Sequence, residues 1–130
     1  MTNRKFYPFF ITLVLSIVFF IIYIFLARKG IILSLEPNES IGDISRWCER
    51  VSGGIFREPS NALSNIGFMI LGLIMFWVLA KDIKSNTSNQ FTGLNSISVL
   101  YAGAAVFLGP GSLLMHGTHT EWGEWADNLS

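Results

Sequence analysis

The feature that most constrains this chain is a run of twenty-two residues, Phe6 to Ala27, that contains no charged side chain. At a rise of about 1.5 Å per residue, a helix of this length spans roughly 30 Å, the thickness of the hydrocarbon core of a bilayer. Basic residues flank the run, with Arg4 and Lys5 before it and Arg28 and Lys29 after it. The run therefore predicts a membrane-spanning helix.

A cleaved secretory signal peptide is the alternative interpretation of the same run. Signal-peptide cores usually contain about 7–15 apolar residues and end at a small-x-small cleavage site. This run is longer, and no such site precedes Arg28. We therefore expect an uncleaved anchor helix within residues 1–30, followed by a membrane domain over residues 31–130.

Two further segments predict membrane spans, at about residues 61–80 and 92–116. The first begins with polar residues and ends apolar, and Pro59 precedes it, where a helix tolerates proline. The second contains no formal charge and is rich in small residues, which allow helices to approach closely. Within it, the triplet Gly109-Pro110-Gly111 predicts a kink or an unwound turn.

The composition agrees with a membrane protein. Hydrophobic residues make up 51% of the chain and charged residues 14%, whereas a soluble domain carries about 25% charged residues. Nine basic and nine acidic residues cancel, which leaves no basic excess for binding nucleic acid. The single cysteine, Cys48, has no internal disulfide partner. We expect an all-α fold, an integral, multi-pass membrane helical bundle.

Three spans place the connection over residues 28–60 and the tail over residues 117–130 on the same side of the membrane. The connection carries five Lys/Arg and five Asp/Glu, and the polar loop from Lys81 to Gln90 carries two lysines. This distribution of basic residues leaves the direction of insertion open. The shared side matters because both segments carry carboxylates.

Ser112 and His116 are spaced i, i+4 and share one face of the third predicted helix. Asp127 follows eleven residues after His116, near the start of a further predicted helix, and could fold back toward them. Imidazole binds Zn²⁺, a carboxylate can take a proton from metal-bound water, and a hydroxyl can donate to a developing oxyanion. The spacing fits equally well a serine bonded to its own helix and a histidine that caps the helix end.

His119 lies three residues after His116, but Gly117 and Thr118 are expected to end the helix between them. This disfavours a metal-binding histidine pair. Glu121 and Glu124 are expected to be solvated charges at the start of the next helix.

A second polar group, Trp47, Glu49 and Glu58, precedes the second span. Loop carboxylates and carbonyl groups suit a hard cation such as Ca²⁺. The alternative is a tryptophan that anchors the loop at the membrane interface, with both glutamates in water.

Together, these residues resemble the alkaline ceramidase family. The segment Trp47-Cys48-Glu49, followed by Glu58-x-x-Asn61-x-x-Ser64-Asn65, is similar to the first motif of that family. The segment Gly109-x-Gly111-Ser112-x-x-x-His116, followed by Asp127, is similar to the second. A wider superfamily of membrane hydrolases and receptors shares the Ser-x-x-x-His pattern. The short separation between His116 and Asp127 in the sequence resembles ceramidases more closely than the other members. The resemblance covers about Arg46 to Ser130.

The resemblance implies a larger bundle of about seven transmembrane helices that holds one Zn²⁺ and hydrolyses the amide bond of a ceramide-like lipid. By analogy His116 is a zinc ligand, Ser112 supports the oxyanion or the metal-bound water, and Asp127 transfers protons. The implied structural or regulatory Ca²⁺ site comprises residues before the second span: Trp47, Glu49 and Glu58.

The resemblance also implies that further helices complete the site. Catalytic zinc normally has three protein ligands, and the family supplies two from a histidine pair on a late helix, whereas this chain has only His116 and His119. We therefore expect the sequence to be the N-terminal part of a longer protein, with the remaining helices as its partners. A non-catalytic lipid-sensing receptor on the same scaffold and a small structural membrane protein remain the alternatives.

Overall fold

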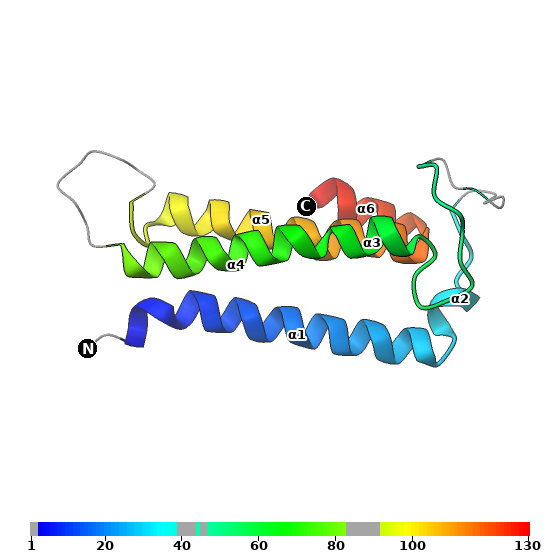
Figure 1. Cartoon of the computed structure of the whole chain (residues 1–130), viewed down its shortest axis with the longest axis horizontal. Coiled ribbons are helices and arrows are strands. Elements are labelled where there is room, and N and C mark those ends of the chain that lie inside the picture. Colours follow the sequence, from blue (N-terminus) through cyan, green and yellow to red (C-terminus); the bar gives the residue numbers. More distant parts are fainter. Residues whose placement is uncertain (1–2, 39–43, 45–46, 83–91) are drawn as a thin grey trace.

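The computed structural model describes residues 3–38, 44, 47–82 and 92–130. These residues form helices and no strands, which confirms the predicted all-α class. Figure 1 shows the long helices lying side by side, with a short helix doubled back over one end. The helical elements, in chain order, are η1 (Asn3–Phe6), α1 (Tyr7–Arg28), α2 (Ile31–Ser34), α3 (Pro59–Ser64), α4 (Ile66–Lys81), α5 (Ser96–Thr118) and α6 (Glu121–Leu129).

Within the described residues, three helical segments are long and apolar enough to cross a membrane: Arg4–Arg28, Pro59–Lys81 and Ser96–Thr118. The three predicted spans are therefore present as helices. The third begins four residues later than predicted, because the Asn95 side chain accepts hydrogen bonds from the N–H groups of Ile97 and Ser98 and caps the helix there. Most of the predicted polar loop, residues 83–90, lies outside the described residues.

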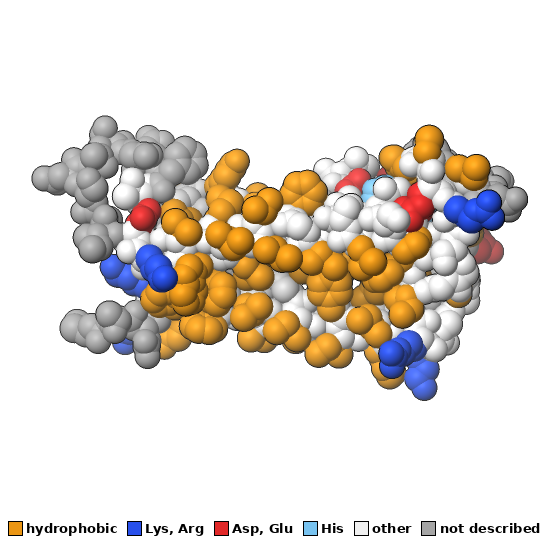
Figure 2. Space-filling model, viewed as in Figure 1, with side chains coloured by type: hydrophobic (Ala, Val, Ile, Leu, Met, Phe, Trp, Pro, Cys, Tyr) orange, Lys and Arg blue, Asp and Glu red, His pale blue; other side chains and the backbone are white. Residues whose placement is uncertain are grey.

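The outer surface of the helices is apolar along most of their length. In the most apolar window of the first span only 11% of the residues are buried. Figure 2 shows hydrophobic side chains along the middle of the molecule and Lys and Arg side chains at both ends. This distribution suits a protein surrounded by lipid, since water solvates the charged ends and not the apolar middle.

Helices α4 and α5 pack through glycines at two levels. A Cβ atom at Gly72 would lie 2.7 Å from the backbone N of Val106, and one at Gly109 would lie 2.9 Å from the backbone O of Asn65. Neither position has room for a side chain, so the two backbones approach as closely as small residues permit.

Helix α5 continues without interruption through Pro110, so the expectation of an unwound turn at Gly109-Pro110-Gly111 is wrong. The two glycines provide close contacts instead. Gly109 faces α4, and a Cβ at Gly111 would lie 2.8 Å from the backbone O of Ala126 in α6. The triplet therefore marks the level at which α5 touches both neighbours.

Helix α6 folds back along α5. Its N-cap, Thr120, accepts a hydrogen bond from the N–H of Gly123, and Gly123 packs against Leu114 and Thr118 of α5. Because Gly111 packs against Ala126 and Ser130, the later residues of α6 lie beside earlier residues of α5. Asp127 thus lies in the last turn of α6, and not near the start of that helix as the sequence suggested.

Helix α1 lies against the α4–α5 pair, and aromatic contacts hold it there near both of its ends. Near one end, Phe6 and Phe9 contact the Trp77 ring at centroid distances of 5.0 and 5.2 Å. Near the other, the Tyr23 ring stacks on Phe56 at 5.0 Å and its hydroxyl donates to the carbonyl of Ile55 at 3.1 Å. This second attachment joins α1 to the segment that leads into the candidate site.

Candidate functional site

The site is built where the segment before α3 crosses the C-terminal end of α5. The backbone N–H of Arg57 donates to Gly117 O at 3.1 Å, and that of Glu58 donates to His116 O at 3.0 Å. Carbonyl groups in the last turn of a helix lack partners within the helix. The crossing segment satisfies two of them, and this fixes Glu58 beside His116.

Glu58 is completely buried and its carboxylate lies between two imidazoles. The Oε2 atom is 2.5 Å from Nδ1 of His116, and Oε1 is 3.1 Å from Nε2 of His119. The side-chain amide of Asn61 also donates to Oε2, at 3.2 Å. A buried carboxylate needs such donors, because desolvation otherwise disfavours its charged form.

Trp47 lies against both histidines. Its ring centroid is 5.0 Å from that of His116 and 5.9 Å from that of His119, and both contacts are close to edge-on. The residue is 38% exposed, so the indole covers the pair and also meets the surroundings. The first and second sequence motifs, separated by the whole of α4, therefore meet at one end of the bundle.

The Glu49 side chain caps the start of α3. Its two carboxylate oxygens accept hydrogen bonds from the backbone N–H groups of Ser60 and Asn61, at 2.6 and 2.8 Å. Partial burial acts to raise the pKa of Glu49, but the two N–H donors outweigh it and the net pKa is lowered. An ionised carboxylate at this position complements the positive end of the helix dipole.

Ser112 lies in α5 one turn before His116, and both side chains are half-buried. The Ala126–Gly111 contact places Asp127 close to the level of Ser112 along α5. In the part of the chain that the structure describes, the Asp127 side chain makes no hydrogen bond to either residue. The structure thus brings the three predicted residues to one end of one helix pair without joining Asp127 to the other two.

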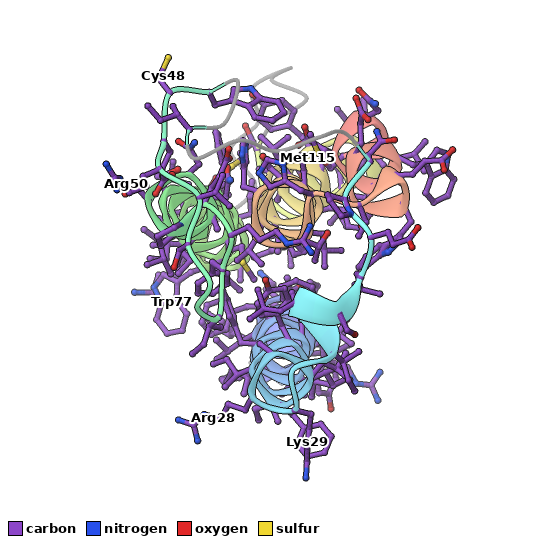
Figure 3. The ribbon with its side chains drawn as sticks, turned by 90° about the vertical axis from the view of Figure 1, so that its right-hand side faces the viewer. Arg28, Lys29, Cys48, Arg50, Trp77 and Met115 are labelled. Carbon is purple, nitrogen blue, oxygen red and sulfur yellow. The ribbon has the colours of Figure 1, made fainter. Side chains whose placement is uncertain are left out.

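The face of α5 that carries Ser112 and His116 is not the face that α1 covers. Successive residues of a helix are about 100° apart, so Gly117, which packs against Tyr23 of α1, points well away from His116. Viewed along the helices, Figure 3 shows α1, with Arg28 and Lys29, on one side of the α4–α5 pair and Cys48 on the opposite side. Helix α1 therefore supports the site from behind.

His119 is a site residue that the sequence analysis set aside. Helix α5 ends at Thr118 as expected, but His119 adopts a left-handed conformation, with φ of 52°, and is 8% exposed. Burial lowers its pKa, and the Glu58 carboxylate opposes that effect only in part. The sequence gives no signal for the contact, because the helix end separates the two histidines and Glu58 is distant in the chain.

Arg57 is the second residue that sequence reasoning missed. Its side chain is 7% exposed, and Nη2 donates to the carbonyl of Leu35 at 2.6 Å. Burial lowers the pKa of the guanidinium, which nevertheless stays protonated at neutral pH. The contact ties the chain that follows α2 to the residue preceding Glu58.

The predicted zinc site can be tested against the contacts of His116. A metal-binding histidine usually donates its second ring N–H to a carboxylate, and His116 has its Nδ1 on Glu58. This arrangement leaves Nε2 for a metal and fits one zinc ligand. Among the described residues no group of three His, Cys, Asp or Glu side chains is placed to hold a metal ion, so His116 would need ligands from elsewhere.

The predicted calcium residues lie close together but do not form a ligand set of that kind within the described residues. Glu49 accepts from two backbone N–H groups, Glu58 contacts two histidines, and Trp47 presents its ring to both histidines. A Ca²⁺ ion here would have to displace the two N–H donors from Glu49, and the calcium site stays a prediction. Arg46, which precedes Trp47, lies outside the described residues.

Comparison with known proteins adds no relative. No protein-family model, no curated protein and no solved structure matches the chain.

Proposed function

We propose that this chain forms part of a membrane-embedded, zinc-dependent hydrolase that cleaves the amide bond of ceramide-like lipids. The observation that carries the proposal is the buried Glu58 carboxylate on Nδ1 of His116, with Ser112 one turn away on the same helix face. A carboxylate–histidine pair of this kind orients an imidazole for metal binding. The motif resemblance supplies the reaction class.

Each residue has a distinct task in the proposed reaction. Zn²⁺, when bound, supplies hydroxide at neutral pH and polarises the amide carbonyl. Nε2 of His116 contributes one ligand, and Glu58 keeps the imidazole in the tautomer that leaves Nε2 bare. The Ser112 hydroxyl donates to the carbonyl oxygen of the scissile amide as negative charge develops on it.

Asp127 carries the proton in this proposal. Its carboxylate takes the proton of the attacking water and delivers it to the amide nitrogen as the C–N bond breaks. One water is consumed, and the products are a fatty acid and a sphingoid base. Asp127 must approach Ser112 more closely than it does here, as catalytic contacts often tighten once substrate is bound.

The location of the site suits a lipid substrate. Ser112 and His116 lie in the last turns of a span that ends at Thr118, where a lipid can present its polar amide while its chains stay in the bilayer. The remaining zinc ligands are proposed to come from further helices, packed on the face of α5 that α1 leaves uncovered. No step of the proposal uses Ca²⁺.

The test is hydrolysis of a fluorescent N-acylsphingosine in lipid vesicles by the protein expressed from its complete coding sequence. H116A should abolish release of fatty acid, and S112A and D127N should each lower kcat by roughly 10²–10³-fold. S16A removes a serine hydroxyl from α1 that, among the described residues, bonds to the Thr12 carbonyl of the same helix, and it should change nothing. Absence of turnover in a wild-type protein that binds zinc would favour the receptor instead.

A further inference from the structure

The segment that leads into α3 joins the first span to the candidate site. The carbonyl of Ile55 accepts a hydrogen bond from the Tyr23 hydroxyl at 3.1 Å. The Phe56 ring stacks on the Tyr23 ring with an interplanar angle of 13°. Nη2 of Arg57 donates to the carbonyl of Leu35 at 2.6 Å. Three successive residues are therefore held by α1 or by the chain that follows α2.

The next residue, Glu58, is the one that meets His116. Its N–H donates to the His116 carbonyl at 3.0 Å, and its Oε2 lies 2.5 Å from Nδ1 of His116. The N–H of Arg57 donates to the Gly117 carbonyl at 3.1 Å. The contact between the carboxylate and the imidazole is thus continuous with a segment that the first span holds from the other side of α5.

We propose that Tyr23 and Arg57 are positioning residues: they hold the segment before Glu58 so that Oε2 of Glu58 accepts Nδ1–H from His116. A hydrogen bond is lost once its donor and acceptor lie more than about 3.5 Å apart, so a displacement of Glu58 by about 1 Å breaks the contact. Neighbouring Cα atoms are joined by a planar peptide at a fixed separation of about 3.8 Å. A shift of Arg57 is therefore carried to Glu58.

Tyr23 packs directly against the last turn of α5. A Cβ atom at Gly117 would overlap the Tyr23 hydroxyl oxygen and would lie 3.4 Å from Cδ1 of Phe56. Only glycine lets the ring approach the α5 backbone this closely, and Tyr23 is 2% exposed. The hydroxyl has little freedom to leave the Ile55 carbonyl, so α1 fixes the segment relative to the helix that carries His116.

Arg57 confines the segment further. Its side chain is 7% exposed, and Nη1 is buried without a hydrogen-bond partner among the described residues. Nη2 contacts the carbonyls of Leu35 at 2.6 Å and Leu33 at 3.4 Å. A buried cation with so few acceptors loses most of its hydrogen bonding if the segment moves, so these carbonyls hold Arg57 in one place.

The experiment reads the tautomer of His116 by ¹⁵N-histidine NMR, on metal-free protein from the complete coding sequence in lipid nanodiscs. The pH is chosen so that the ring is neutral, and H116A identifies the signals of His116. In a neutral imidazole one nitrogen carries the proton, and the ¹⁵N shifts distinguish Nδ1–H from Nε2–H. The wild type should show the Nδ1–H form.

Two variants release the segment, and each has a matched control. R57M removes the guanidinium donors but keeps a long side chain, and Y23L removes both the hydroxyl and the stacked ring. Each should shift His116 from the Nδ1–H form to a mixture of tautomers. The controls are R50M and F25L, because Arg50 and Phe25 are exposed, and both should keep the wild-type tautomer.

Two further variants separate positioning from a general loss of stability. Y23F removes only the hydroxyl, so it should fold where Y23L does not, and it should shift His116 in the same direction by less. G72A disturbs the contact between α4 and α5 farther along the pair and should leave the His116 tautomer as in the wild type. Helical circular dichroism confirms that each variant is folded.

An unchanged His116 tautomer in any folded variant among R57M, Y23L and Y23F overturns the inference, as does an equal shift in G72A. A second readout, zinc affinity by chelator competition, rests on the proposed function and should fall about 10–100-fold in R57M. Absence of zinc binding in every variant and in the wild type, or an unchanged affinity despite a shifted tautomer, would contradict the proposed function and leave the positioning role intact.

Discussion

The two ends of the α4–α5 pair satisfy their polar groups in opposite ways. At the end near Asp82 and Asn95 the bonds among the described residues join positions close in the sequence: Asn95 and Ser98 form a capping box, and the N–H of Gly93 donates to the Asp82 carboxylate eleven residues earlier. At the end near His116, the carboxylate and the histidine that meet are 58 residues apart. One end is organised by its own sequence, and the other exists only when the helices assemble.

This difference has an energetic consequence. A local cap contributes to its helix whether or not the other helices are in place, whereas a buried long-range pair leaves unsatisfied groups behind when one partner is removed. Substitutions at the His116 end should therefore cost more, and should affect more of the molecule, than substitutions at the Asn95 end.

The largest effect is expected for Glu58. E58A should remove the acceptor shared by His116 and Asn61 and destabilise the protein by roughly 1–3 kcal/mol for each group left unsatisfied. The measurement is reversible unfolding in mixed micelles, with E121A as the control, because Glu121 is an exposed glutamate at the start of α6. Equal stability of E58A and E121A would remove the contrast between the two ends.

The next effect is expected midway between the ends, where Gly72 holds α4 and α5 together. A methyl group there would meet the backbone of Val106, so G72A should cost about 1–3 kcal/mol. Gly103 in α5 has nothing within 4 Å of the position of a Cβ, and G103A should be neutral or stabilise by up to about 1 kcal/mol. The same micelle assay measures both, and a change of the same sign in the two variants would refute the close contact.

A smaller, pH-dependent effect is expected for Glu49. Its pKa in the folded protein is lowered below the ordinary value of 4.5. As pH falls below about 4.5, the Glu49 carboxylate is therefore protonated in the unfolded chain while it is still ionised in the folded one. The stability that Glu49 contributes is therefore complete above pH 4.5 and is lost as pH falls through its folded pKa. Unfolding measured from neutral to acid pH should show a shallower decline for E49Q than for wild type; parallel curves would contradict the cap at α3.

The smallest effect is expected for Asn95. N95A removes an N-cap and should cost about 1 kcal/mol. It should leave the ¹⁵N spectrum of His116 unchanged, because the cap bonds from the N–H groups of Ile97 and Ser98 lie at the opposite end of α5. A change in the ¹⁵N chemical shifts of the His116 ring in N95A would show that the two ends are coupled, and would contradict the contrast between them.

The amino-acid sequence predicted the spans well because each depends on a continuous apolar run. The stretches around Phe6–Ala27 and Ser96–Thr118 are long and apolar enough to cross a membrane whatever the rest of the chain does. The unwound turn was expected because a proline usually disturbs a helix, but α5 continues through Pro110, and the flanking glycines allow α4 and α6 to approach.

The site was only partly predictable, for a geometric reason. The i, i+4 spacing of Ser112 and His116 is a property of one helix and was readable. The contact of Glu58 with both histidines depends on how the segment before α3 crosses the end of α5, and on the left-handed backbone of His119. Neither leaves a periodic signal in the sequence. The burial of Arg57 and its hydrogen bond to the Leu35 carbonyl could not be predicted for the same reason.

The most direct test of the central claim, that His116 is presented to a metal at this end of the bundle, is the zinc content of the protein purified from its complete coding sequence. The proposal predicts one zinc per chain in the wild type and in S16A, and none in H116A. A wild-type protein free of zinc after purification without chelators, or an H116A variant that holds as much zinc as the wild type, would contradict it.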